Sequence, residues 1–348
     1  MKPSRIFILL SVLFVACTTE RQQQSAPWQG EEPDSVCFDL TQIQAAGELI
    51  AVTLSGPDTY YDYMGRHLGV HFMLSEQFAS AIGVRLRVEV CRDTAEVLSR
   101  INDGDADIAM LRLSTDTLTP GWLVGGGKPQ LSEAIASWYR PEMLQQARQT
   151  ERSLLSSRRV VRRVSAPMLR RGVVSHYDAL FKQYARAIGW DWRLIAAQCY
   201  QESTFDPEAR SWAGAVGLMQ IMPTTADHLG LSRDMLTDPE RNVEAATRLL
   251  AELESQFSSI ADRKERQCFV LAAYNGGAGH ISDAQRLAQR DGRNSSRWAD
   301  VRQYVLLLSE PRYYQDTLVH YGYMRGAETA DYVDRIRQRY AEYSRRVR

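Results

Sequence analysis

Apolar residues recur every three or four positions almost throughout the second half of the chain, from Tyr177 onward, and this spacing predicts helices. One predicted helix begins after Asp238-Pro239, an N-cap followed by a first-turn proline. Its apolar stripe consists of Val243, Ala246, Leu250, Leu253 and Phe257. Another apolar helix spans Cys268 to Tyr274 and ends at a glycine pair. The pattern therefore predicts an all-α domain over residues 175–348.

In the first half of the chain, short apolar runs alternate with helical patterns. The predicted elements are, in order, a strand at 49–54, a helix at 72–82, a strand at 84–90, a helix at 94–102 and a strand at 107–111. This alternation predicts an α/β lobe with a largely parallel sheet. A tyrosine-rich cluster, Tyr60 to Tyr63, follows the first strand. Its rings either line a groove or pack in the core, and we favour core packing.

Length and charge add little to this picture. The chain has 348 residues, which suits two domains, and Lys+Arg and Asp+Glu both number 42. The balance of charge implies neither a nucleic-acid partner nor an acidic one. An arginine-rich connector over 145–174 is either a solvated helix or linker, which we favour, or a segment attracted to anionic cell-wall polymers or lipid headgroups.

The N-terminus reads as a targeting segment. Lys2 and Arg5 precede an apolar run that is too short to span a bilayer, and the run ends at Cys17 in a sequence that resembles a bacterial lipobox. We expect residues 1–17 to be a lipoprotein signal peptide, 18–47 a tether, and Cys17 a lipidated anchor. Thr18 then implies an outer-membrane location facing the periplasm. The alternative is an ordinary secretory signal with a chance cysteine.

Four further cysteines remain in an exported chain. Cys37 and Cys91 share the N-terminal part and could pair, whereas Cys199 and Cys268 lie on apolar helical patterns and are expected to be buried thiols. The sequence contains no C-x-x-C motif and no histidine cluster. We therefore predict no metal site and no cofactor.

The segment from Gln198 to Pro223 contains the candidate chemistry. Glu202 continues the stripe of Ile195 and Cys199 at the end of a predicted helix, Asp191 to Ser203, so it is in line with apolar residues. Taken alone, it could equally be tied into a structural network or exposed at the helix end. The loop that follows adds a hydroxyl, an amide, glycines and adaptable apolar surface: Ser211, Gly214, Gly217, Met219, Gln220 and Met222. Together these groups suit a cleft that binds a polyol.

These motifs resemble those of the soluble-type lytic transglycosylases, enzymes of goose-lysozyme-like fold that cut peptidoglycan. The matching residues are Glu202-Ser203, Ser211, Gly214-Ala215, Gly217-Leu218-Met219-Gln220 and Ala273-Tyr274-Asn275. The wider similarity covers about half of the chain and is strongest to the membrane-bound F subfamily. The resemblance implies that Tyr274 and Asn275 face the substrate cleft and that Glu328 and Tyr332 close its far side. Gly276 departs from the alanine usual after the asparagine.

The resemblance also implies a mechanism that needs only one carboxyl group. Protonated Glu202 would donate to the oxygen between N-acetylmuramic acid and N-acetylglucosamine, and would then take the proton of the muramic acid C6 hydroxyl as a 1,6-anhydro ring closes. Asp206 lies next to a proline and is expected to belong to the helix end. An apolar helix face would raise the pKa of Glu202 above the usual value of about 4.3.

The first lobe resembles half of a family 3 periplasmic solute-binding protein. The matching stretches are GVHFMLSEQFASAIGVRLRVEV and LSRINDGDADIAML, with Leu123-Val124 and a helix from Pro129 to Tyr139 as the closing segment. Residues 48–144 leave no room for the second lobe that would enclose a ligand, and His71 and Met73 replace acidic residues usual in that helix. We therefore favour docking to a muropeptide or a cell-wall protein over amino-acid sensing.

Three functions from different classes remain open. The leading one is a lipid-anchored peptidoglycan lyase that acts on glycan strands. A hydrolytic muramidase of the same fold would deliver water in place of the C6 hydroxyl. A non-enzymatic cell-wall-binding lipoprotein would have no need of a buried acid, so Glu202 argues against it.

Overall fold

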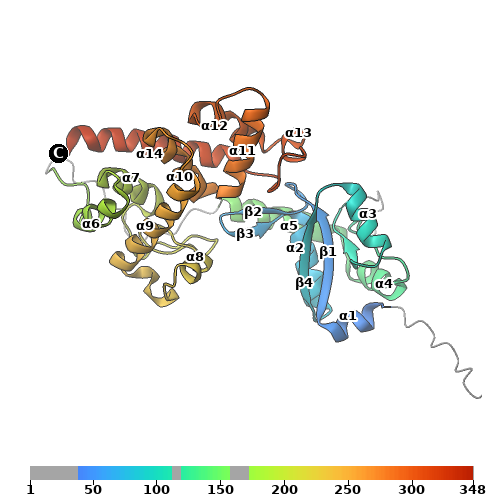
Figure 1. Ribbon diagram of the computed structural model, residues 1–348. Coiled ribbons are helices and arrows are strands. Elements are labelled where there is room, and N and C mark those ends of the chain that lie inside the picture. The colour runs from blue at the N-terminus through green and yellow to red at the C-terminus, as the bar shows by residue number, and fades with distance from the viewer. Residues whose placement is uncertain (1–37, 112–118, 157–171, 348) are drawn as a thin grey trace, which may run out of the picture. The chain divides into compact units, whose positions relative to one another are not determined.

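The computed structural model describes residues 38–111, 119–156 and 172–347 (Figure 1). All of them belong to one unit of the chain. The predictions for residues 1–17 and for Cys37, and residues 157–171 of the arginine-rich connector, lie outside the described residues. No helix within the described ranges is long and apolar enough to cross a membrane. The domain boundaries drawn from the sequence stay predictions.

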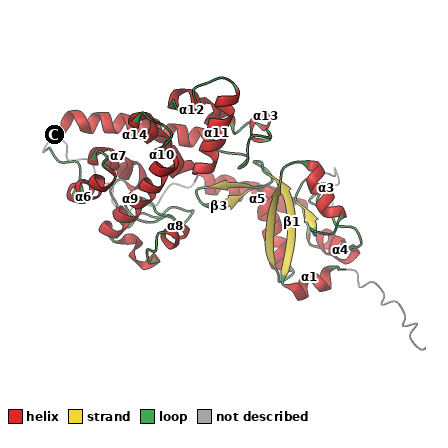
Figure 2. Cartoon of the chain, viewed as in Figure 1, coloured by secondary structure: helices red, strands yellow, loops and turns green. Residues whose placement is uncertain are grey.

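The N-terminal part is a small α/β lobe. Its elements are α1 (Leu40–Ala46), β1 (Glu48–Leu54), β2 (Tyr61–Tyr63), β3 (Arg66–Leu68), α2 (Val70–Ala81), β4 (Arg85–Cys91), α3 (Thr94–Asn102), β5 (Ile108–Ala109), β6 (Leu123–Val124), α4 (Pro129–Trp138) and α5 (Pro141–Ser156). The main sheet has the order β4-β1-β5-β6, in which β1 is parallel to β4 and β5 while β5 and β6 are antiparallel. Figure 2 shows strands in yellow and helices in red. The sheet is therefore mixed, although largely parallel as predicted.

Strand β1 is buried on both faces because each side of the sheet has its own apolar cluster. Leu49 and Ala51 pack with residues of α2 and α4, whereas Val52 packs with Val97 and Ile101 of α3. The two-residue period of a strand sends successive side chains to opposite faces, so one apolar run serves both clusters.

The sequence patterns did not predict strands β2 and β3, which form an antiparallel hairpin. Met64 and Gly65 link them, and both have positive φ (49° and 72°). Two successive residues in that region are typical of the tight turn that joins twisted strands. Because the hairpin is only three residues long on each side, its alternating pattern is too short to be recognised in the sequence.

The C-terminal part is helix-rich, as predicted. Its helices are α6 (Asp178–Ile188), α7 (Trp192–Ser203), α8 (Pro223–His228), the 3-10 helix η2 (Arg233–Thr237), α9 (Pro239–Gln256), α10 (Arg263–Gly276), α11 (Ala278–Arg290), α12 (Trp298–Leu307), α13 (Pro311–Tyr314) and α14 (Gly326–Arg346). Helix α7 packs against α6 and α14, and α10 packs against α9, α11 and α14. The apolar faces of these helices form one cluster that includes the predicted stripe of α9.

The cysteines of the C-terminal part behave as small apolar residues. Cys199 and Cys268 are buried free thiols, which confirms the prediction. Burial raises the pKa of both thiols, that of Cys268 to about 11, so neither is a reactive thiolate near neutral pH.

Candidate active site

Helix α7 carries Glu202 into the wall of a groove. Asp191 is the N-cap of this helix, since its carboxylate accepts from the Arg193 N–H, and the apolar face of the helix is buried in the core. Glu202 continues that face as the second-last residue of the helix, and the residue is only 5% exposed. The placement agrees with the sequence pattern and excludes a Glu that is merely exposed where the helix ends.

A buried tyrosine holds the Glu202 carboxyl. The Tyr332 hydroxyl, from α14, donates to Glu202 Oε1 at 2.6 Å, and Gln198 Nε2 donates to the same hydroxyl at 3.2 Å. Burial and the nearby Glu202 carboxylate raise the pKa of Tyr332 well above its ordinary value. The phenol therefore stays protonated and is a fixed hydrogen-bond donor to the Glu202 carboxyl.

The loop between α7 and α8 is fastened to α9 by a buried asparagine. Asn242 Nδ2 donates to the carbonyls of Val216 and Leu236 at 3.0 and 2.8 Å, and its Oδ1 accepts from the Met219 N–H at 2.7 Å. Gly217 has φ 87°, and a Cβ there would lie 2.3 Å from the Leu236 carbonyl oxygen. No sequence pattern marked Asn242, because nothing in its spacing separates it from the surface positions of α9.

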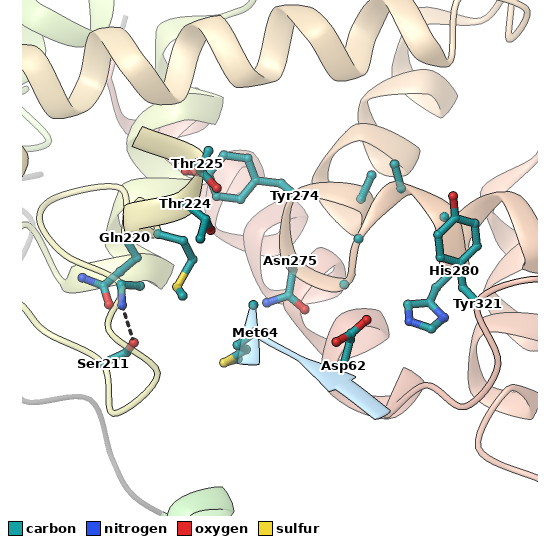
Figure 3. Close-up of a pocket in the computed structure, with 18 of the residues that line it drawn as sticks. Asp62, Met64, Ser211, Gln220, Thr224, Thr225, Tyr274, Asn275, His280 and Tyr321 are labelled. Atoms are coloured by element: carbon teal, nitrogen blue, oxygen red, sulfur yellow. Dashed lines mark hydrogen bonds between the residues drawn. The ribbon is translucent and has the colours of Figure 1, made fainter. Parts of the chain in front are cut away.

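The groove has a volume of about 520 Å³. Glu202 and five other residues predicted to bind substrate line it: Ser211, Met222, Gln220, Tyr274 and Asn275. Figure 3 labels four of them, Ser211, Gln220, Tyr274 and Asn275. Main-chain and side-chain hydrogen bonds fix these groups in place. Ser211 Oγ accepts from the Ala215 N–H at 2.9 Å, and the Tyr274 hydroxyl donates to the Met219 carbonyl at 2.8 Å. Asn275 Oδ1 accepts from the Thr329 hydroxyl at 2.8 Å.

Gln220 is the most constrained of these residues. Its Nε2 donates to the carbonyls of Ala209 and Gly217, both at 3.0 Å, while its buried Oε1 has no partner. Its backbone also has positive φ (52°), which is uncommon outside glycine. An unpartnered buried acceptor in a groove wall is a feature that a hydrogen-bond donor on a ligand would relieve.

Four residues predicted to contact substrate lie elsewhere. Gly217 and Met219 are behind the groove wall, where Gly217 permits close packing and Met219 belongs to the core. Tyr332 is buried beside Glu202, and its hydroxyl donates to the Glu202 carboxyl. Glu328 lines a smaller neighbouring depression, where Arg325 pairs with it at 2.6 Å and the Tyr63 hydroxyl donates to it. The placement of these residues follows from packing partners that are distant in sequence.

Asp206 is not a second acid in the groove. Its carboxylate accepts from the Glu208 N–H at 3.0 Å and is buried in the turn after α7, as expected of a residue at the helix end. Among the described residues no group of His, Cys, Asp and Glu is arranged to hold a metal ion.

The sequence patterns missed the other end of the groove. Its lining comes from the β2–β3 hairpin and from two places after α10: Asp62, Met64, Gly65, His67, His280 and Tyr321. We call this the hairpin end, and the part formed by Glu202, Ser211 and Gln220 the acid end; Figure 3 shows Ser211 and Gln220 on one side and His280 and Tyr321 on the other, with Asp62, Met64 and Asn275 between. The tyrosine cluster 60–63 was the one sequence signal for this end, and core packing is only part of its use.

Comparisons with known proteins fit this geometry. Residues 179–296 match the family model described as "Transglycosylase SLT domain". The chain is 42% identical over 160 residues to a membrane-bound lytic murein transglycosylase F of Desulfosudis oleivorans, and 40% identical over 164 residues to that of Marinobacter nauticus. These matches cover 46% and 47% of this chain but only 34% and 32% of the relatives. The chain therefore spans about a third of their length.

A solved structure is also similar. The 70 kDa soluble lytic transglycosylase SLT70 of Escherichia coli is 28% identical, with a TM-score of 0.33, over 49% of this chain and 24% of that one.

Proposed function

We propose that this chain, which carries a transglycosylase SLT domain over residues 179–296, is a peptidoglycan lytic transglycosylase. The observation that supports this most is a single buried carboxyl, Glu202, in the wall of an open groove lined by hydroxyl and amide groups. A glycan strand is long, polar and rich in hydroxyls and acetamides, so an open groove with such a lining suits it.

Glu202 is the general acid and then the general base. In the proposed step the neutral carboxyl donates its proton to the oxygen of the MurNAc-β-1,4-GlcNAc bond, and the bond to the muramic acid C1 breaks. Removal from water favours the neutral form of a carboxyl, and the side chain of Glu202 is buried. General acid catalysis of this kind contributes about 10²–10⁴-fold.

The substrate supplies the nucleophile. The muramic acid C6 hydroxyl attacks C1, and Glu202, now a carboxylate, takes the hydroxyl proton, which leaves a 1,6-anhydro ring and regenerates the acid. An intramolecular nucleophile acts at effective concentrations up to about 10⁵–10⁸ M, so a second carboxylate to activate water is unnecessary. Tyr332 positions the acid through its 2.6 Å hydrogen bond.

The alternative is hydrolysis by a muramidase of the same fold. In retaining and inverting glycosidases a second carboxylate acts as nucleophile or activates water. Asp206 is turned into a helix end outside the groove, and Asp62, which does line the groove, pairs with His67 at the hairpin end. These placements favour the lyase.

Mass spectrometry of digested sacculi distinguishes a lyase from a hydrolytic muramidase. A lyase yields muropeptides that are lighter by one water than those of a hydrolase, because the anhydro ring forms without water. Fully hydrated ends would show a muramidase, and intact glycan in the presence of bound protein would show a non-enzymatic cell-wall binder. Either outcome would contradict the proposal.

We also infer that Cys17 is lipidated, which would hold the enzyme at the outer membrane facing the periplasm. A Cys17→Ser chain is expected to leave the membrane fraction while keeping its activity in solution. The α/β lobe is proposed to dock to cell-wall components rather than to enclose an amino acid. Micromolar binding of free amino acids in titration calorimetry of the full chain would contradict that role.

A further inference from the structure

The β2–β3 hairpin of the N-terminal lobe forms part of the groove. In β2 the side chains of Tyr61 and Tyr63 point one way and Asp62 the other, and Asp62 pairs across the hairpin with His67. Both Asp62 and His67 line the groove. The turn reaches the Met222 side chain, because a Cβ on Gly65 would lie 3.0 Å from the Met222 methyl carbon.

Several contacts attach the hairpin to the C-terminal helices. The Tyr63 hydroxyl donates to Glu328, its ring stacks on Trp212 at 6.0 Å, and the Arg325 guanidinium lies 5.3 Å from the ring centre. Nearby, the Tyr323 N–H donates to Ser55 Oγ at 2.9 Å. Asp62 is therefore presented to the groove by a strand that is held on its other face.

Tyr321 is an exposed aromatic ring on a fixed backbone. The side chain is at the groove and the residue is 59% exposed. Its N–H and that of His320 donate to the fully buried Asp283 carboxylate at 2.8 and 3.0 Å. Gly279 leaves room for the ring, since a Cβ there would lie 2.5 Å from it. The backbone that carries the ring is therefore held by a buried carboxylate, which also pairs with Arg286, while the ring itself stays exposed at the groove.

His280 lies between the ring and the hairpin (Figure 3). Its ring is edge-on to Tyr321 with centroids 5.9 Å apart, and its buried Nδ1 has no hydrogen-bond partner. Burial lowers the pKa of His280, so the imidazole is neutral at neutral pH. A buried ring nitrogen without a partner at a groove is an independent sign that a polar ligand completes this end.

We propose that the hairpin end is a saccharide subsite in which Tyr321 packs against the apolar face of a sugar ring while Asp62 accepts hydrogen bonds from its hydroxyls. An aromatic ring offers a flat apolar surface, which matches the C–H face of a pyranose, and a carboxylate offers only acceptors, which match the hydroxyl groups at the edge of the sugar ring. The subsite lies in the same groove as the acid end, where the next units of a bound strand would lie. This inference rests on the proposed function and names a binding determinant that the N-terminal lobe supplies.

The test measures how binding depends on the length of the glycan. In the full chain carrying Glu202→Gln, peptide-free oligosaccharides of alternating N-acetylglucosamine and N-acetylmuramic acid are titrated by calorimetry, with two and with four sugar units. The four-unit ligand is expected to bind about 10-fold more tightly, a difference of about 1.4 kcal/mol. Asp62→Ala and Tyr321→Ala should each remove most of that advantage while leaving two-unit binding within about 2-fold.

Three further chains make the result specific. Tyr321→Phe keeps the ring and should keep the length advantage. Tyr321→Leu replaces the ring with a branched apolar side chain and should behave like the alanine variant, which would show that a flat surface is required. Asp58→Asn changes an exposed aspartate just before the hairpin that does not line the groove, and it should behave as the parent.

The outcomes separate this inference from the proposed function. An unchanged length advantage in both alanine variants, with thermal unfolding as in the parent, would overturn the subsite alone. A length advantage that arises only with peptide-bearing ligands would also overturn it, because the hairpin end would then bind peptide. No saccharide binding by the Glu202→Gln chain and no cleavage by the unsubstituted chain would overturn both.

Discussion

The two ends of the groove are constructed in opposite ways. At the acid end, most of the lining comes from one stretch of sequence between α7 and α8, and the key carboxyl is buried against Tyr332. At the hairpin end, three segments distant in sequence contribute Asp62, His280 and Tyr321, and two of these side chains are largely open to solvent. A carboxyl that is removed from water favours its protonated form, which a general acid needs. Binding of a polar glycan strand instead needs exposed side chains at fixed positions along the groove.

The largest effect is expected from Glu202→Gln at the acid end. The amide keeps the size and the hydrogen bond from Tyr332 but cannot donate a proton and then take one, so turnover of sacculi should fall by at least about 10²–10⁴-fold. Release of soluble muropeptides measures it. Glu208→Gln, an exposed residue six positions later, is the matched control and should retain full turnover. Substantial cleavage by the Glu202→Gln chain would assign the acid to another group.

The acid end also depends on the loop behind it, which Gly217→Ala should disrupt. The residue has positive φ, and the added methyl would meet the Leu236 carbonyl and the Asn242 amide. Strain and clash together should cost about 3 kcal/mol or more of unfolding free energy, measured in denaturant. Gly214→Ala has a similar φ (99°) but open space around it, so it isolates the conformational strain, and about 1–2 kcal/mol is expected. Equal losses of unfolding free energy in the two variants would show that close packing at Gly217 does not contribute to stability.

The same contrast explains what the sequence could predict. Helices α7 and α9 and strand β1 follow from apolar period and caps, because their faces pack on a core that any apolar side chain of suitable size can join. Glu202 could be singled out because a charged residue in line with the apolar residues of one helix is visible in the sequence of that helix alone. The similarity of the motif from Glu202 to Gln220 then gave most of the acid end.

Residues that act through distant partners could not be predicted in this way. Asn242 fastens a loop 23 residues earlier in the chain, and Asp283 fixes Tyr321 from 38 residues away. The hairpin end depends on the contact between the N-terminal lobe and α14. The spacing of apolar residues within either segment does not predict that contact. For the same reason Glu328 was expected to line the groove, whereas its ion pair with Arg325 and its bond from Tyr63 place it beside the groove.

A smaller effect should come from the donor to the acid. Tyr332→Phe removes the hydroxyl that binds Glu202 and leaves Gln198 without its acceptor, so about 1–2 kcal/mol of stability is expected to be lost. Because a donor favours the charged carboxyl, its removal should move the alkaline limit of turnover to higher pH and lower kcat about 10-fold with little change in KM. Tyr343→Phe, on the same helix, removes a buried hydroxyl that has no partner and should be neutral or slightly stabilising. An unchanged pH profile in Tyr332→Phe would show that the phenol is only structural.

The smallest effect belongs to the hairpin end and depends on pH. The hydrogen bond with Asp62 raises the pKa of His67 above its usual value, opposed by partial burial and assisted by the charges of Asp62 and Glu76. A raised folded pKa means that the pair contributes stability that is fully present below the unfolded pKa of about 6.5 and is lost as pH rises through the folded value. Because both side chains are more than half exposed, the contribution should be below about 1 kcal/mol. Denaturant unfolding at pH 5.5, about one unit below the unfolded pKa, and at an alkaline pH should show a larger difference for the parent than for His67→Gln. His228→Gln, which changes an exposed histidine on α8, should keep the parent's difference, and an equal change in both variants would show that the hairpin pair does not couple to folding.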